Sequence, residues 1–327
     1  MLASLIRHAA GGGLGVPGHA VEIVGAGDVL DLDPSYPRSG HPQGAADAIE
    51  ATLTDHAELA AALRRASAAG CGVHLVAGNH DPAVATPQGR AAIQRVLGPS
   101  VAVWSWYFPA ASGAHVEHGH LYDPANAGQA DVTLGGIGAR HAHLAFPGLD
   151  PEGIDSVHPR EYARHALALV GADPAHARRA VLAGANFLRS ASLVDEACVK
   201  RARGELLAQL GGSVQLEHGR QLAAVDRRHL ELVAGACTPA EFTRARGWDG
   251  YHAGVVEELA RASRRVQALR GAPTVIFGHV HRARDERTAS GARLLNAGCW
   301  SERGGTFAIH NSSSEGTPTG VYAWGTP

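Results

Sequence analysis

Long apolar runs and paired cysteines are both missing from this 327-residue sequence. No stretch approaches the roughly 18 apolar residues that a membrane-spanning helix requires. The segment from Met1 to Ala20 lacks the compact apolar region of a signal peptide. The four cysteines form no CxxC pair and show no spacing typical of a disulfide framework. The sequence therefore predicts a cytoplasmic protein without a transmembrane segment.

An excess of charge is missing as well. The formal net charge is -2, and Lys200 is the one lysine, so nearly all positive charge comes from arginine. This balance gives no general reason to expect nucleic acid or an anionic membrane as a partner. Hydrophobic residues make up 45% and charged residues 18%, which is typical of a soluble globular protein. The composition does not determine the oligomeric state.

Apolar periodicity divides the first part of the chain into helices and strands. Leu2, Leu5, Ile6 and Ala9 form a short helical stripe, and one long amphipathic helix is expected over 43–69, before Gly70. Further segments favour strands, and we expect these at 21–24, 71–77, 101–108, 115–117, 274–277, 293–296, 306–310 and 321–324. Strands and helices that alternate in this way indicate a layered α/β core.

Helical periodicity replaces this alternation from about residue 155 to residue 270. The capping box that begins at Thr238-Pro239 is one of several helix starts in this part of the chain. We therefore predict a core over residues 1–124 and 271–327, interrupted by a mainly helical cap over residues 125–270.

Four predicted strands, far apart in sequence, end in Asp, Asn or His directly beside a glycine. The side chains that these strand ends supply are Asp28, Asn79, His118, His279 and His281. Imidazole nitrogens and carboxylate or amide oxygens suit divalent ions such as Mn, Fe and Zn, and glycine lets backbone and ligands approach closely. The pattern predicts a metal site at these strand ends.

The same segments resemble the motifs of a known family. Gly27 to Asp31 resembles GDxxD, Gly78 to Asp81 is a complete GNHD, and Gly278 to His281 is a GHxH. With the His118-Gly119 pair between them, they follow the order of the calcineurin-like metallophosphoesterase superfamily. The resemblance covers residues 21–124 and 272–310. It implies a four-layer α/β/β/α sandwich and an enzyme that hydrolyses phosphoester bonds with two divalent metal ions (Mn, Fe or Zn).

Residue roles also follow from the resemblance. Asp28 would bridge the two metals, Asn79, His118 and His279 would complete the shell of one, and His281 would bind the other. The ions would clamp the phosphoryl oxygens and lower the pKa of a shared water that attacks phosphorus. His80 would act as the general acid on the leaving oxygen, and Asp81 would orient it. The expected substrate is a small-molecule or nucleotide phosphoester.

One family motif has no counterpart in this sequence. The family opens with DxH on its first strand, about 30 residues before GD, and this motif supplies two ligands to the second metal. His8 and His19 precede Asp28, but neither has an aspartate two residues before it. We interpret the chain as starting after that strand. If the chain is complete, the second metal site is incomplete.

Other functions remain open at this stage. A metallophosphoesterase fold could keep a partial site as a non-catalytic metal-binding or protein-interaction module, or the site could belong to a mononuclear zinc hydrolase. The cap lies between the third and the fourth ligand segments, so we expect it to border the active site and to select the substrate. Its position is similar to that in UDP-diacylglucosamine pyrophosphohydrolases, which have GNRD where this chain has GNHD. Phosphomonoesterase, nucleotide phosphodiesterase and protein phosphatase activities also remain alternatives. His120 is expected on the same strand face as His118, in contact with substrate or solvent.

Overall fold

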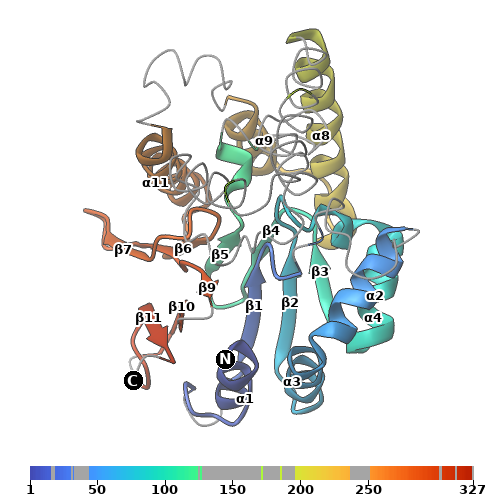
Figure 1. Cartoon of the computed structure of the whole chain (residues 1–327). Helices are drawn as coiled ribbons and strands as arrows, with labels where there is room; N and C mark the ends of the chain where they lie inside the picture. Colours follow the sequence, from blue (N-terminus) through green and yellow to red (C-terminus); the bar gives the residue numbers. More distant parts are fainter. Residues whose placement is uncertain are drawn as a thin grey trace.

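The computed structural model gives the protein a mixed α/β fold with parallel and mixed sheets (Figure 1), which confirms the predicted α/β class. It describes residues 1–15, 19–30, 32, 44–123, 126, 171, 185, 196–235, 251–301, 304–313 and 315–325. Most of the predicted cap, including the capping box at 238–241, lies outside the described residues. The boundaries of that cap stay a prediction.

The first sheet is parallel, and its strands follow the order β1 (Glu22–Ala26), β2 (Gly72–Val76) and β3 (Ala102–Trp104). Four helices share a hydrophobic cluster with one face of this sheet, namely α1 (Leu2–Ala10), α2 (Ala45–Asp55), α3 (Ala57–Ala68) and α4 (Pro87–Leu97). Strand alternation directs Val73 and Leu75 toward these helices and Val76 toward the opposite face. The sheet is therefore covered on both faces, as parallel sheets require.

The second sheet has the order β4 (Tyr107–Pro109), β5 (Ala114–Glu117), β6 (Thr274–Phe277), β8 (Arg293–Asn296) and β7 (Arg284–Arg287). Its three inner strands are parallel, and β4 and β7 run antiparallel at the two edges. Val116, Ile276 and Leu295 pack in one cluster with Val76 of the first sheet. The two sheets therefore face each other across a shared apolar layer.

The third sheet is small and antiparallel, with the order β11 (Gly320–Trp324), β10 (Gly304–Ile309) and β9 (Trp300–Ser301). Ala308 and Val321 pack against the cluster between the two larger sheets. The last strands of the chain thus extend the same apolar layer. The strands expected at 306–310 and 321–324 are confirmed.

Three helices of the predicted cap region cover the other face of the second sheet, namely α8 (Glu196–Glu217), α9 (Ala224–Ala234) and α11 (Tyr251–Arg270). Val266 of α11 and Val233 of α9 share a cluster with Val275 and Phe277 of β6. At the end of α8, the Glu217 carboxylate pairs with Arg90 and accepts a hydrogen bond from the Ser105 amide (3.0 Å). These helices are packed directly on the sheet that carries the candidate site.

The prediction of one long helix over 43–69 is wrong, because the structure has two helices there, α2 and α3. His56 lies between α2 and α3 with φ -103° and ψ 47°, outside the helical region. The apolar spacing continues across this break, so periodicity alone does not reveal it. The break lets α2 pack on α4 while α3 packs on α1 and β2.

The strand expected over 101–108 is also two strands. The chain leaves the first sheet after β3, passes through Ser105 and Trp106, and enters the second sheet as β4. Continuous β propensity hides this change of sheet. His120 does not lie in a strand either: Gly119 has φ 103°, and His120 opens the short 3-10 helix η2 (His120–Tyr122). The prediction that His118 and His120 share one face of a strand is therefore wrong.

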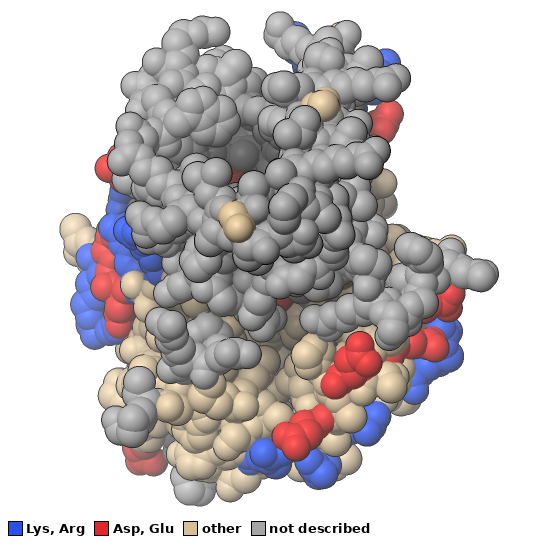
Figure 2. Space-filling model, viewed as in Figure 1, with Lys and Arg blue, Asp and Glu red and all other residues tan. Residues whose placement is uncertain are grey.

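Figure 2 shows acidic and basic side chains interspersed on the described surface at the edges formed by α2 with α4 and by α11 with β7. Glu50 pairs with Arg95 (2.6 Å), and Arg264 pairs with Glu286 (2.8 Å). The expectation that nucleic acid is not a partner stays a prediction. Among the described helices, none combines the length and the apolar character needed to cross a bilayer.

Candidate metal centre

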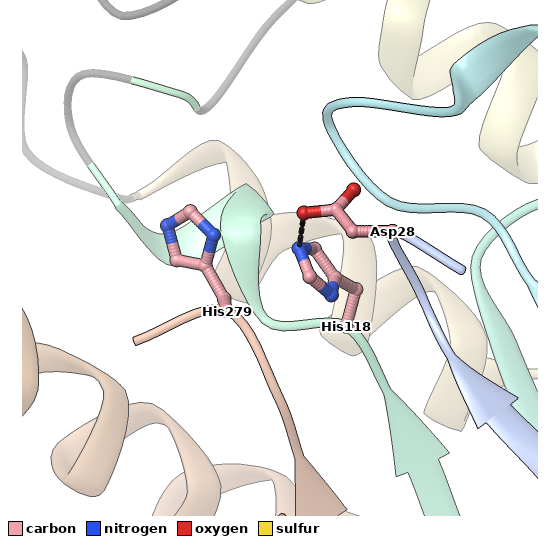
Figure 3. A group of neighbouring side chains, drawn as sticks. All are labelled: Asp28, His118 and His279. Atoms are coloured by element: carbon pink, nitrogen blue, oxygen red, sulfur yellow. Dashed lines mark ion pairs between the residues drawn. The ribbon is translucent and has the colours of Figure 1, made fainter. Parts of the chain in front are cut away.

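Three predicted ligands meet where three strands end. Asp28 follows β1, His118 follows β5, and His279 follows β6. One ligand atom from each lies within 4.8 Å of the corresponding atoms of the other two. Figure 3 shows these side chains projecting from their separate strands into the same region, with an ion pair between Asp28 and His118. The parallel strands therefore bring together residues up to 251 positions apart in sequence.

The backbone at the predicted ligands has an unusual conformation. Asp28 (φ 52°), His279 (φ 70°) and His281 (φ 53°) are the non-glycine residues with positive φ in the described part of the chain. A side chain held in this region costs about 1–3 kcal/mol, and such residues cluster at functional sites. All three are residues that the motifs assign to metal binding. The surrounding structure therefore stabilises strained backbone at the residues that the motifs assign to the metal site.

Two glycines make room for the ligands. A Cβ atom on Gly27 would overlap the imidazole ring of His118, and a Cβ atom on Gly78 would overlap the carboxylate of Asp28. Steric exclusion thus explains why glycine precedes Asp28 and Asn79 in the motifs. They let the loops after β1 and β2 approach the ligand side chains without a gap.

We therefore expect Gly78→Ala to displace Asp28. The added methyl group should lower the free energy of unfolding by about 1–3 kcal/mol, as overpacking does, and should weaken metal binding. Thermal unfolding and metal titration would measure both effects. Gly212→Ala is the matched control, because nothing lies within 4 Å of a Cβ at this position in α8 and alanine favours a helix. A Gly78→Ala protein as stable as the control would contradict the steric argument.

His118 presents a lone pair to two oxygen atoms. Its Nδ1–H donates to the carbonyl oxygen of Ala26 (2.8 Å), which fixes the proton of a neutral ring on that nitrogen. Its Nε2 lies 2.9 Å from Asp28 Oδ2 and 3.0 Å from Asn79 Oδ1. Nitrogen and oxygen lone pairs that converge in this way are stabilised by a cation placed among them. The arrangement fits a divalent metal ion.

The pKa values of this pair describe the same electrostatics. Burial raises the pKa of Asp28, but the charge of His118 and its hydrogen bond outweigh burial and hold that pKa below its usual value. Burial lowers the pKa of His118, and the Asp28 carboxylate outweighs it, so the pKa of His118 is raised. A proton on Nε2 therefore takes the position that a metal cation would take.

Asp81 ties the two ligand loops together. Its Oδ1 accepts a hydrogen bond from the Gly78 amide (2.6 Å), and its Oδ2 accepts one from the Val29 amide (2.9 Å). The His80 amide donates in turn to Asp28 Oδ1 (2.8 Å). Burial and the neighbouring Asp28 carboxylate raise the pKa of Asp81 to about 6. These contacts make Asp81 a support of the loop, while its role in orienting the His80 side chain stays a prediction.

His281 lies at the margin of the other predicted ligands. The residue is exposed and is not a member of the group formed by Asp28, His118 and His279, although the charges of these residues act on it. Asn79 completes that group through its contact with His118. The described residues therefore bring together one group of side chains that could hold an ion, and His281 stands at the edge of this group.

Two features of the site were not predicted from the sequence. Asp123 is buried, and its Oδ2 lies 2.8 Å from His279 Nε2. A second buried group consists of His115, Glu117 and His229, whose ligand atoms also lie within 4.8 Å of one another. His115 and Glu117 lie on the strand that precedes His118, but His229 comes from α9, and no motif links these residues. Only the fold brings them together.

Neither a protein-family model nor a curated protein sequence matches this chain. The resemblance to calcineurin-like metallophosphoesterases therefore stays a prediction. It depends on three motifs, their order, and the geometry of the residues that they contain.

Proposed function

We propose that this protein hydrolyses phosphoester bonds with the help of divalent metal bound by Asp28, Asn79, His118 and His279. One observation carries the proposal: His118 Nε2 faces the oxygens of Asp28 and Asn79 at about 3 Å, and His279 lies beside them. These four side chains offer two imidazoles, one carboxylate and one amide oxygen. Such a mixed set suits Mn, Fe or Zn.

The layering of the fold supports the proposal. Helices α1 to α4 pack on the first sheet, this sheet faces the second, and α9 and α11 cover the second. A four-layer α/β/β/α sandwich, the architecture that the family resemblance implies, has this order of layers. The candidate ligands then lie at strand ends of both sheets, since Asp28 follows β1 and His118 follows β5.

Each side chain has a distinct role in the proposed reaction. Divalent ions, when bound, supply Lewis acidity and a water of lowered pKa for attack on phosphorus. Asp28 holds charge at the centre of the site, and its second oxygen fixes the loop through the His80 amide. His80 donates a proton to the leaving oxygen. Asp81 keeps the loops after β1 and β2 in register through their amides.

A second candidate is a site for one ion, in a mononuclear hydrolase or a non-catalytic binding module. The exposed position of His281, outside the group of three, favours it. Elemental analysis of the purified chain distinguishes the candidates, because the two-metal enzyme requires about two ions per chain. One ion in an active sample would favour the mononuclear hydrolase, and one ion with every phosphoester left intact would favour the binding module.

Hydrolysis assays test the proposed function directly. We expect bis-p-nitrophenyl phosphate or p-nitrophenyl phosphate to be cleaved with added Mn²⁺, and cleavage to stop when a chelator removes the ion. Comparison of the two substrates separates diesterase from monoesterase activity. Asn79→Ala should lose this activity, because it removes an oxygen from the ligand set. Asp55→Ala, an exposed acid at the end of α2, should keep it. Metal-loaded protein that cleaves neither ester would contradict the proposal.

A further inference from the structure

Asp123 forms a hydrogen bond with the imidazole ring of His279. Asp123 Oδ2 lies 2.8 Å from His279 Nε2, and the carboxylate is buried, with 4% of the residue exposed. An imidazole N–H that donates to a carboxylate at this distance fixes the tautomer of the ring and its orientation. Because Nε2 is engaged by Asp123, Nδ1 is the nitrogen that His279 can offer to an ion.

Tyr122, the residue before Asp123, is held by a buried polar network. Its hydroxyl group donates to Glu117 Oε2 (2.9 Å) and lies 2.7 Å from His229 Nε2. The other oxygen of Glu117 lies 2.6 Å from His115 Nε2 and 3.0 Å from His229 Nε2. All four side chains are buried. The short turn that carries Asp123 is therefore attached at one end to the strand before His118 and, through His229, to α9.

This network is a set of hydrogen bonds and not a second metal site. Arg270 donates to Nδ1 of His229 from two guanidinium nitrogens (3.1 and 2.8 Å). A guanidinium can only donate, so Nδ1 carries the lone pair and Nε2 carries the proton. Nε2 faces the Tyr122 hydroxyl group (2.7 Å) and the Glu117 carboxylate (3.0 Å), and with a proton it donates on that side and cannot bind metal. Arg270 also pairs with Asp226 (2.7 Å), which balances its charge.

We propose that Asp123 is a positioning residue for the metal ligand His279, and that Tyr122, held by Glu117 and His229, keeps Asp123 in place. This inference rests on the metal site of the proposed function. Partners of this kind fix ligand geometry and raise ligand basicity, and their loss weakens metal binding by about 10- to 100-fold. The network thus extends the metal site into the helices that cover the second sheet.

Metal affinity of Asp123 variants tests the proposal without any activity assay. We expect Asp123→Ala to weaken Co²⁺ binding by about 10- to 100-fold in competition with a chromophoric chelator. Asp123→Asn, which retains an oxygen acceptor for Nε2–H, should lose less. Asp55→Asn, an exposed acid, is the matched control and should bind Co²⁺ as the unaltered protein does. A lowered melting temperature with unchanged Co²⁺ affinity would show a structural role alone and overturn the proposal.

The absorption spectrum of bound Co²⁺ separates positioning from direct ligation. We expect Asp123→Asn to retain the number of bound ions and to shift the visible bands, because the His279 ring is less well oriented. Loss of one ion per chain in this variant would make Asp123 itself a ligand and would also overturn the proposal. Hydrolysis by the unaltered protein is measured separately. Its absence would reject the proposed function, and the affinity result would still stand.

A second pair of variants tests the support by Tyr122. Tyr122→Phe removes the hydroxyl group from Glu117 and His229 but leaves Asp123 unchanged, and we expect Co²⁺ affinity to fall several-fold. Tyr322→Phe is its control, because the Tyr322 hydroxyl group donates to the Pro318 carbonyl oxygen (2.6 Å) in an exposed hydrogen bond. Equal Co²⁺ affinity of the two phenylalanine variants would overturn the role of the network.

Discussion

Asp28→Ala should remove bound metal and phosphoester hydrolysis together. The Asp28 carboxylate lies against His118 on one side and accepts the His80 amide on the other, so its loss deprives the ligand set of its negative charge. Metal ions contribute several kcal/mol to the stabilisation of charge in such transition states, which corresponds to a loss of roughly 1,000-fold in rate or more. Elemental analysis and Mn²⁺-dependent hydrolysis of bis-p-nitrophenyl phosphate measure the two effects.

The control for this variant is Asp55→Ala, which removes an equal charge from an exposed position on α2. Both variants lose one carboxylate, so a change in net charge alone affects them equally. Asp28→Ala protein that keeps its metal content would show that Asp28 is not a ligand. Retained hydrolysis in a metal-depleted variant would separate the activity from this site.

His80→Ala should likewise have low turnover but should differ from Asp28→Ala in keeping nearly full metal content. The predicted role of His80 is proton donation to the leaving oxygen, which general acids accelerate by about 10²- to 10⁴-fold. The contact that His80 makes with Asp28 uses the backbone amide, and alanine retains that amide. Turnover and metal content measured on the same sample test this prediction.

His19→Ala, which alters an exposed histidine, is the control for His80→Ala. If His80→Ala loses as much metal as Asp28→Ala, the division of roles between the two residues is wrong. A less reactive leaving group sharpens the test, because a proton donor matters more when the departing oxygen is basic. The defect should therefore be larger for an alkyl ester than for p-nitrophenyl phosphate.

Much of the candidate site follows from the sequence because each predicted ligand stands at the end of a predicted strand. The strands before Asp28, Asn79 and His279 were expected at or close to their observed positions, and parallel strands bring such ends together. The glycines beside the ligands indicated close approach, which the structure confirms at Gly27 and Gly78. Local signals were sufficient where the site is made of strand ends.

Long-range features were beyond these signals. The breaks at His56 and at Ser105-Trp106 fall inside continuous patterns, and only packing against other elements shows why the chain turns there. The edge strand β7 was missed because its sequence, Arg284 to Arg287, is entirely charged. Asp123 was missed because its partner His279 is 156 positions away in sequence. Tertiary contacts decide these features, and periodicity does not record them.

The parallel pairing of β5 with β6 has a consequence for how the protein is made. Ala114 of β5 pairs with Thr274 of β6, so a ribosome must add 160 residues after Ala114 before this pair can form. At 5–20 residues per second this takes roughly 10 to 30 s, and throughout this time β5, with the apolar side chain of Val116, presents an open edge. Open edges of this kind attract other chains. The yield of folded protein should therefore depend on chaperones that cover this edge more than on the stability of the finished fold.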